Sequence, residues 1–179
     1  MNIDTLIDDA IGREGGYVNH PADRGGATRW GITEAVARAH GYRGEMRSFP
    51  RVDAVAIYHR IYWLRPGFAE VAEVAPTIAA ELFDTGINMG PAVAVAFLQR
   101  ALNALNRGAS DYADIVAGPR VDAATLVALR AFLKKREPGG TSVLMKALEA
   151  LQGERYLDLA ERRPANEAFL YGWLANRIG

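Results

Sequence analysis

The amino-acid sequence predicts a mainly α-helical protein of the α+β class, with about eight helices and one short, irregular β-hairpin. Apolar residues recur at helical spacing through most of the chain, beginning with Ile3, Leu6, Ile7 and Ile11. Glycine and proline pairs interrupt this pattern at intervals that suit single helices. The exception is residues 14–33, a run with five glycines that shows neither a helical nor a strand period.

The first helix should end at Gly15–Gly16, which places Glu14 at its last turn. Turn residues then separate short extended pieces, so we expect a small hairpin before residue 33. Thr33 can cap a helix that runs to about Ala39, because its hydroxyl can accept a hydrogen bond from a backbone N–H of the first turn. A further helix is expected from near Val52 to Trp63, ended by Pro66–Gly67.

The second half of the chain reads as a series of amphipathic helices. Proline suits the first turn of a helix, and Asp and Thr are good N-caps. The expected helices begin at Pro76, Pro91 (to Leu105), Asp122 (to about Lys135), Thr141 (to about Arg162) and Asn166 (to Ile178). We expect helix 91–105 to be the most enclosed. The apolar stripe of the last helix should also be buried, so truncation before Phe169 should unfold the protein.

Composition excludes several classes of function. The chain has 179 residues, enough for one compact unit or two closely packed ones, and its 21 basic residues balance 21 acidic ones. A nucleic-acid-binding protein needs a clustered basic excess, so we expect no such partner. Cysteine is absent and the three histidines show no metal-ligand spacing, so we expect neither a metal nor a cofactor. We also expect a monomer without stable membrane insertion, made in the cytoplasm without a signal peptide.

Three residues of the glycine-rich segment suggest chemistry. Glu14 follows an apolar helix, where desolvation favours a neutral carboxyl, whereas Asp23 lies in a polar loop that favours an ionised one. Glycosidic cleavage needs an acid and a nearby anion, with a hydroxyl such as that of Thr28 to orient water. From the residues alone, Glu14 could equally be a surface residue, and Asp23 could only satisfy turn amides.

The segment EGGYVNHPADRGGATRWGIT resembles the N-terminal signature of the glycoside hydrolase family 108 N-acetylmuramidases, which include phage endolysins and bacterial secretion activators. The segments IYHRIYW, LFDTGINMG, FLQRALN and FLYGWLANRI are similar to the rest of that family. The resemblance implies a lysozyme-like fold, with a muramidase region over residues 1–90 and a helical, predicted peptidoglycan-binding region over residues 91–179 packed against it. It also implies cleavage of the β-1,4 bond between N-acetylmuramic acid and N-acetylglucosamine. Glu14 matches the family's essential acid, and Asp23 and Thr28 follow in the order of phage-type lysozymes.

Peptidoglycan glycan strands would then be the partner, and several further residues are candidates for contacting them. Aromatic rings such as Tyr17 and Trp30 can stack on sugar faces or pack in the core. Arg29, like Arg24, can meet stem-peptide carboxylates or the muramic lactyl group, or lie in solvent. The remaining candidates are Asp84 and Asn88, which can bind acetamido groups or form a solvated edge, and Gln99, which we expect to be a satisfied core amide rather than a substrate contact. For Trp63 and Trp173 we expect packing.

Two other functions compete with hydrolysis. A lytic transglycosylase would use Glu14 alone, with the muramic 6-hydroxyl in place of water, and a non-catalytic protein would only bind the wall. An enzyme made in the cytoplasm would act in the periplasm or cell wall, so we expect it to depend on a holin or another release route.

Overall fold

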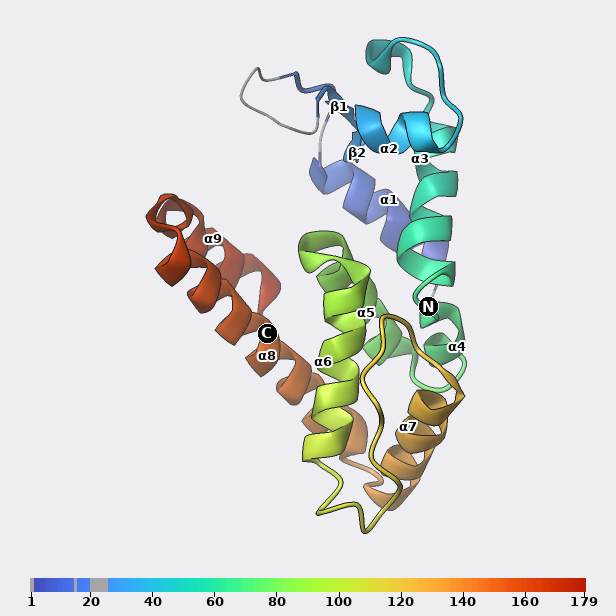
Figure 1. Ribbon diagram of the computed structural model, residues 1–179, viewed down its shortest axis with the longest axis vertical. Coiled ribbons are helices and arrows are strands. Elements are labelled where there is room, and N and C mark those ends of the chain that lie inside the picture. The colour runs from blue at the N-terminus through green and yellow to red at the C-terminus, as the bar shows by residue number, and fades with distance from the viewer. Residues whose placement is uncertain (1, 15, 20–25) are drawn as a thin grey trace. The chain divides into compact units, whose positions relative to one another are not determined.

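The computed structural model describes residues 2–14, 16–19 and 26–179, and the chain divides into two compact units, Met1–Arg65 and Pro66–Gly179. Helices dominate the described chain and a two-stranded antiparallel sheet accompanies them, which confirms the predicted mainly α, lysozyme-like class (Figure 1). The first unit contains α1 (Ile3–Glu14), β1 (Thr28–Arg29), β2 (Ile32–Thr33), α2 (Glu34–Ala39), the 3-10 turn η1 (Met46–Ser48), α3 (Arg51–Tyr58) and the π-helix η2 (His59–Leu64). The second contains α4 (Phe68–Ala72), α5 (Pro76–Met89), α6 (Pro91–Ala104), α7 (Ala123–Lys135), α8 (Gly140–Arg162), the 3-10 turn η3 (Pro164–Asn166) and α9 (Glu167–Arg177).

In the first unit, α1 buries the predicted apolar stripe, with Ile7 and Ile11 at most 2% exposed. Its polar face is tied to α3 by an ion pair and to η2 by a side-chain hydrogen bond. Arg51 contacts Asp8 at 2.5 Å, and the His59 ring lies 3.0 Å from Asp4. The order of these contacts shows that the two helical segments run antiparallel. Because both pairs are exposed to solvent, the apolar stripe contributes most of the stabilisation.

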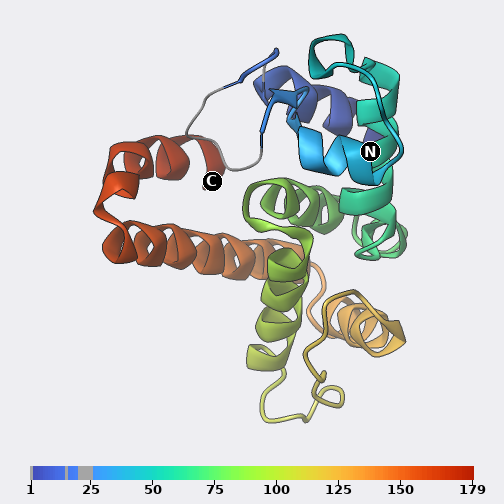
Figure 2. The same cartoon turned by 45° about the horizontal axis from the view of Figure 1, so that its top comes forward.

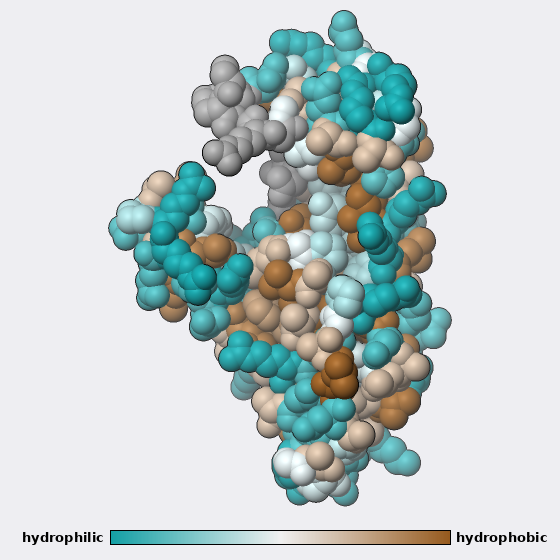
Figure 3. All heavy atoms as spheres, in the orientation of Figure 1, coloured by the Kyte–Doolittle hydropathy of each residue, from teal (hydrophilic) through white to brown (hydrophobic). Residues whose placement is uncertain are grey.

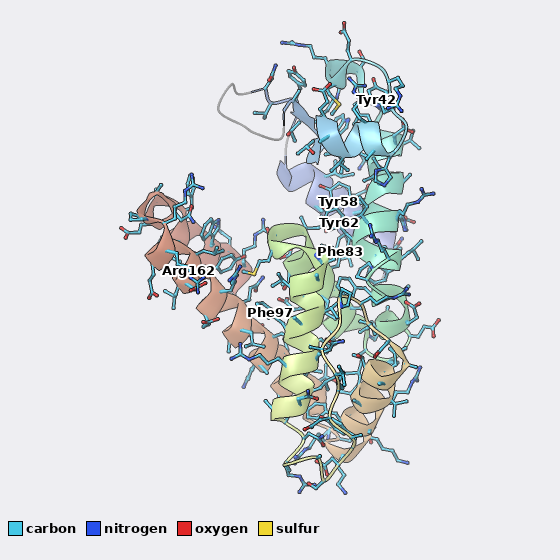
Figure 4. All side chains as sticks on the ribbon, viewed as in Figure 1. Tyr42, Tyr58, Tyr62, Phe83, Phe97 and Arg162 are labelled. Carbon is cyan, nitrogen blue, oxygen red and sulfur yellow. The ribbon has the colours of Figure 1, made fainter. Side chains whose placement is uncertain are left out.

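The predicted helix from Val52 to Trp63 is present, but its second half is a π-helix. The backbone N–H of Arg65 donates to the carbonyl of Arg60, five residues earlier, at 3.0 Å. The rings of Tyr58 and Tyr62 stand 5.3 Å apart on adjacent turns (Figure 4). Trp63 is 6% exposed, as expected for a packing residue. Apolar spacing does not distinguish an α-turn from the wider π-turn, so this change could not be predicted from the pattern of apolar residues.

The core of the second unit forms between α5, α6, α7 and α8 (Figure 2). Prolines begin α5 and α6 as predicted, and α6 buries an extensive face that includes Leu98 and Leu102. The short helix α4 was not predicted, because five residues after Pro66–Gly67 carry too little periodic signal. Figure 2 shows α8 and α9 side by side as a helical hairpin.

Gln99 is a core amide, as expected. It is 1% exposed, donates to Thr125 Oγ1 at 3.2 Å and accepts from the Gly118 N–H at 2.9 Å. Asp122 caps α7 as predicted, since its carboxylate accepts from the backbone N–H of Thr125 at 2.8 Å. These bonds attach the connector between α6 and α7 to the core, so the long irregular segment is held without regular structure of its own.

Two expectations for the C-terminal helices are wrong. The helix predicted to be capped by Thr141, α8, begins at Gly140 and has no side-chain cap. A Cβ at Gly140 would meet the Cβ of Arg136 at 2.9 Å, so close packing fixes this helix start. The second, α9, contains no buried residue, and Phe169 is 59% exposed. This helix packs mainly on α8 and the turn η3, with the ring of Trp173 stacked 5.2 Å from that of Tyr156.

A carboxylic acid is partly buried where α5 meets α8. Burial, then the charge of Asp84, raises the pKa of Glu81, with a smaller contribution from Glu149 in the same direction. Opposing this, the Thr85 hydroxyl donates to Glu81 at 3.3 Å, and it accepts from the buried amide of Gln152 at 3.3 Å. Charge at this position therefore opposes folding.

Among the described residues, no helix has both the length and the apolar content needed to cross a membrane.

Candidate active site

Glu14 is the last residue of α1. The helix directs its buried side inward through Ala10 and Ile11, so its C-terminal end is fixed relative to the rest of the first unit. The side chain of Glu14 lies outside the described part of the chain, as do Asp23 and Arg24 entirely. The roles predicted for these residues stay predictions. The structure describes the segments on either side of them.

The chain that leaves α1 pairs with the first strand of the hairpin. Val18 and Thr28 form an antiparallel bridge in which each backbone N–H donates to the other's carbonyl at 2.8 Å. Val18 follows Glu14 by four residues, which span at most about 14 Å when fully extended. The bridge therefore holds Thr28 near the end of α1 and closes the loop that carries Asp23.

The hairpin itself is set by a two-residue turn. Arg29 pairs with Ile32, and the turn residues Trp30 and Gly31 have φ values of 56° and 73°. Positive φ at both positions is the type I′ geometry that matches the twist of the strands. Because neighbouring side chains in a strand point to opposite faces, Thr28 lies on the face away from Ile32, which is buried. Thr28 thus lies on the face of the hairpin opposite the buried Ile32, and its predicted role stays a prediction.

Trp30 anchors the hairpin. Its indole N–H donates to the carbonyl of Phe49 at 3.0 Å, and the guanidinium of Arg29 lies 5.1 Å from the centre of the ring. A residue with a Cβ at positive φ is strained by about 1–2 kcal/mol, so these contacts offset a cost of the turn. Trp30 and Arg29 are both half-buried, and their predicted contacts with sugar and carboxylate groups stay predictions.

A polar groove of about 280 Å³ adjoins the ends of the loop. Tyr17 forms part of its wall, with the guanidinium of Arg47 lying 4.6 Å from the centre of its ring. Glu34 and Arg38, which also line the groove, form an ion pair of 2.7 Å along α2. The groove is lined by Tyr17, Asn19, Ala27, Glu34, Arg38, Glu45, Met46 and Arg47. Sequence reasoning identified only Tyr17 among them.

The groove residues that were not predicted differ in whether a sequence pattern could have identified them. Glu34 and Arg38 are four residues apart in a helix with a recognised cap, so their ion pair could have been read from the spacing. Arg47 could not be identified in this way, because its contact with Tyr17 joins the 3-10 turn η1 to a segment far away in the sequence. This part of the site follows from the tertiary fold alone.

Asp84 and Asn88 lie together on α5 in the second unit. The Asn88 side-chain amide donates to the Asp84 carboxylate at 3.0 Å, and Arg177 of α9 donates to both carboxylate oxygens at 3.2 Å. These contacts give Asp84 a structural role in joining α9 to α5. Binding of acetamido groups by Asp84 and Asn88 stays a prediction.

In the described ranges, no group of three or more histidine or carboxylate side chains is arranged to hold a metal ion.

Comparison with known proteins covers nearly the whole chain. Residues 7–90 match the family model of glycosyl hydrolase 108, and residues 93–178 match that of a predicted peptidoglycan domain. The structure is similar to that of Brucella abortus SagA, with a TM-score of 0.70 and 23% sequence identity over 98% of this chain and 91% of that chain. This likeness shows a shared fold. No curated protein matches the sequence.

Proposed function

The chain belongs to the glycosyl hydrolase 108 family, and from this premise we propose that it hydrolyses the β-1,4 bond between N-acetylmuramic acid and N-acetylglucosamine. Its family supports glycoside hydrolysis, and the predicted peptidoglycan domain supports peptidoglycan as the substrate. The observation that carries the finer proposal is the position of Glu14. It ends α1 within the matched region, immediately before a loop whose ends are joined by the Val18–Thr28 bridge.

In this mechanism Glu14 donates its proton to the bridging oxygen as the bond to the muramic anomeric carbon breaks. The N-acetylglucosamine 4-hydroxyl leaves, and the carboxylate of Asp23 stabilises the positive charge that develops on the muramic sugar. Thr28 orients the water whose oxygen bonds to the anomeric carbon. A proton of that water passes to the carboxylate of Glu14, which restores the acid.

Digestion of purified sacculi with wild type and Glu14→Gln tests the proposal. We expect the variant to lose about 10²-fold or more of the rate of fragment release, because an amide cannot donate the proton. Its circular dichroism should match that of wild type. Glu161→Gln is a suitable control, since Glu161 is exposed on α8, far along the chain from the loop.

The masses of the fragments identify the reaction. Products that carry a reducing N-acetylmuramic acid support hydrolysis. Anhydro ends, lighter by one water, would instead establish a lytic transglycosylase. Unchanged digestion by Glu14→Gln would remove Glu14 from the mechanism, and the absence of fragments from wild type would leave a wall-binding protein.

A further inference from the structure

A second groove, of about 390 Å³, lies between α6 and α8 in the second unit. This volume falls in the range of about 300–1,000 Å³ that is usual for ligand sites. Its floor is one face of α6, formed by Ala92, Val93, Ala96 and Phe97. Phe97 is labelled in Figure 4, and Figure 3 shows apolar side chains over α6 with hydrophilic ones beside them.

The rim of this groove carries charges of both signs. Arg100 continues the same face of α6, and Glu154 and Arg155 come from α8. Arg155 already pairs with Asp158 at 3.2 Å. Arg100 and Glu154 are exposed, and neither makes a hydrogen bond or ion pair within the part of the chain that the structure describes. The groove thus offers a guanidinium and a carboxylate beside a floor of small apolar groups.

This lining distinguishes the two components of peptidoglycan. The glycan is uncharged, because the lactyl carboxyl of muramic acid is consumed in the amide bond to the peptide. Sugar sites depend on exposed aromatic faces and on amide side chains. The described lining contains no amide side chain, and its one aromatic residue, Phe97, is 9% exposed. A stem peptide instead has free carboxylates, an amino group on its diamino acid and the methyl groups of alanine.

We propose that the groove between α6 and α8 binds the peptide stem of peptidoglycan, with Arg100 pairing with a stem carboxylate and Glu154 facing the amino group. The alanine methyl groups lie on the floor formed by Ala92, Val93 and Ala96. Most of the lining falls within the matched peptidoglycan domain, residues 93–178. The inference rests on the proposed function for its substrate and assigns the peptide to the second unit.

Isothermal titration of the full chain with a purified stem tetrapeptide tests this assignment. The peptide contains alanine, D-glutamate, a diamino acid and D-alanine, and Glu14→Gln serves as the background. We expect saturable binding that weakens at high salt. Adding Arg100→Gln should weaken it at least about tenfold, since a charge-assisted hydrogen bond is lost. Ala96→Trp, which fills the groove, should weaken it as well.

Arg130→Gln is the matched control, because Arg130 is an exposed arginine on α7 in the same unit. Equal affinity of the Arg100→Gln and control variants would overturn the proposal, as would the absence of tetrapeptide binding. Effective competition by an uncharged N-acetylglucosamine oligomer would overturn it too. Failure of the proposed function is distinct: wild type would then release no fragments from sacculi, whereas Arg100-dependent binding of the tetrapeptide would persist.

Discussion

The anchor of the hairpin leads to a prediction about the active site. Trp30→Phe keeps an aromatic ring at the same backbone position but removes the N–H that donates to Phe49 at 3.0 Å. The strain of positive φ is the same for both side chains, so it cancels between wild type and variant. The substitution therefore acts mainly on the bond that attaches the hairpin to the segment before α3, with a smaller loss from the weaker contact of Arg29 with a phenyl ring.

The expected magnitude follows from that one contact. A hydrogen bond of this kind contributes about 0.5–1.5 kcal/mol, and a carbonyl left without a partner costs about 1–3 kcal/mol if it is fully buried. The contact is part-buried, so water can reach the Phe49 carbonyl and the total should be about 1–2 kcal/mol. Because Thr28 lies on the same hairpin, kcat/KM on sacculi should fall about 10- to 100-fold, as for small misplacements of positioning groups.

Urea unfolding and a turbidity assay measure the two effects, and Trp173→Phe is the control. Within the described chain, the indole of Trp173 makes no hydrogen bond, and phenylalanine can preserve its stacking on Tyr156 at 5.2 Å. We expect that control to change stability by less than about 1 kcal/mol and to keep full activity. Loss of stability in Trp30→Phe with unchanged kcat/KM would refute the idea that the hairpin positions the site.

Three other predictions concern the second unit. Gly67 has a φ of 89°, and a Cβ there would meet the Cβ of Val121 at 2.9 Å, whereas Gly90 has a φ of 96° and open space around it. Gly67→Ala should therefore destabilise the protein more than Gly90→Ala. Equal urea midpoints of the two variants would contradict this. Because the pKa of Glu81 is raised, its ionisation disfavours folding at neutral pH. Glu81→Gln should therefore raise Tm at pH 7, and this gain in Tm should disappear as pH falls below the ordinary pKa of glutamate. A gain in Tm that is independent of pH would show that the ionisation of Glu81 is not its cause. Deletion of α9 should lower Tm but leave a cooperative transition, and complete unfolding by circular dichroism would restore the expectation drawn from the sequence.

Much of the fold was visible in the sequence where a local rule decides the structure. Thr33 and Asp122 cap their helices through side-chain oxygens, and Pro76 and Pro91 stand at first turns, as expected. These features depend on residues within one turn of each other. The start of α8 at Gly140 depends instead on its approach to Arg136, and propensity favoured the wrong neighbouring residue.

The candidate site likewise contains features that depend on local sequence and features that depend on tertiary contacts. Glycines and the order of polar residues marked the segment around Glu14, and alternation along β1 gives the direction of Thr28. The contacts of Trp30 with Phe49 and of Tyr17 with Arg47 join segments that are separated by 19 or more residues. No local pattern encodes which distant backbone carbonyl or guanidinium a ring will meet, so these anchors required the structure.

The contrast between α6 and α9 shows what an apolar stripe does and does not predict. Both helices have one, but α6 contacts α5, α7 and α8, whereas α9 packs on α8 and the short turn before it and reaches α5 only through the ion pair of Arg177 with Asp84. Periodicity identifies the face that gains from burial, and the number of neighbouring elements decides how much burial that face receives. In α6 the face beside α8 also remains partly open, as a groove with unpaired charge at its rim. The ligand proposed for the groove on α6 and the expected tolerance of α9 deletion therefore both follow from apolar faces that neighbouring helices cover only in part.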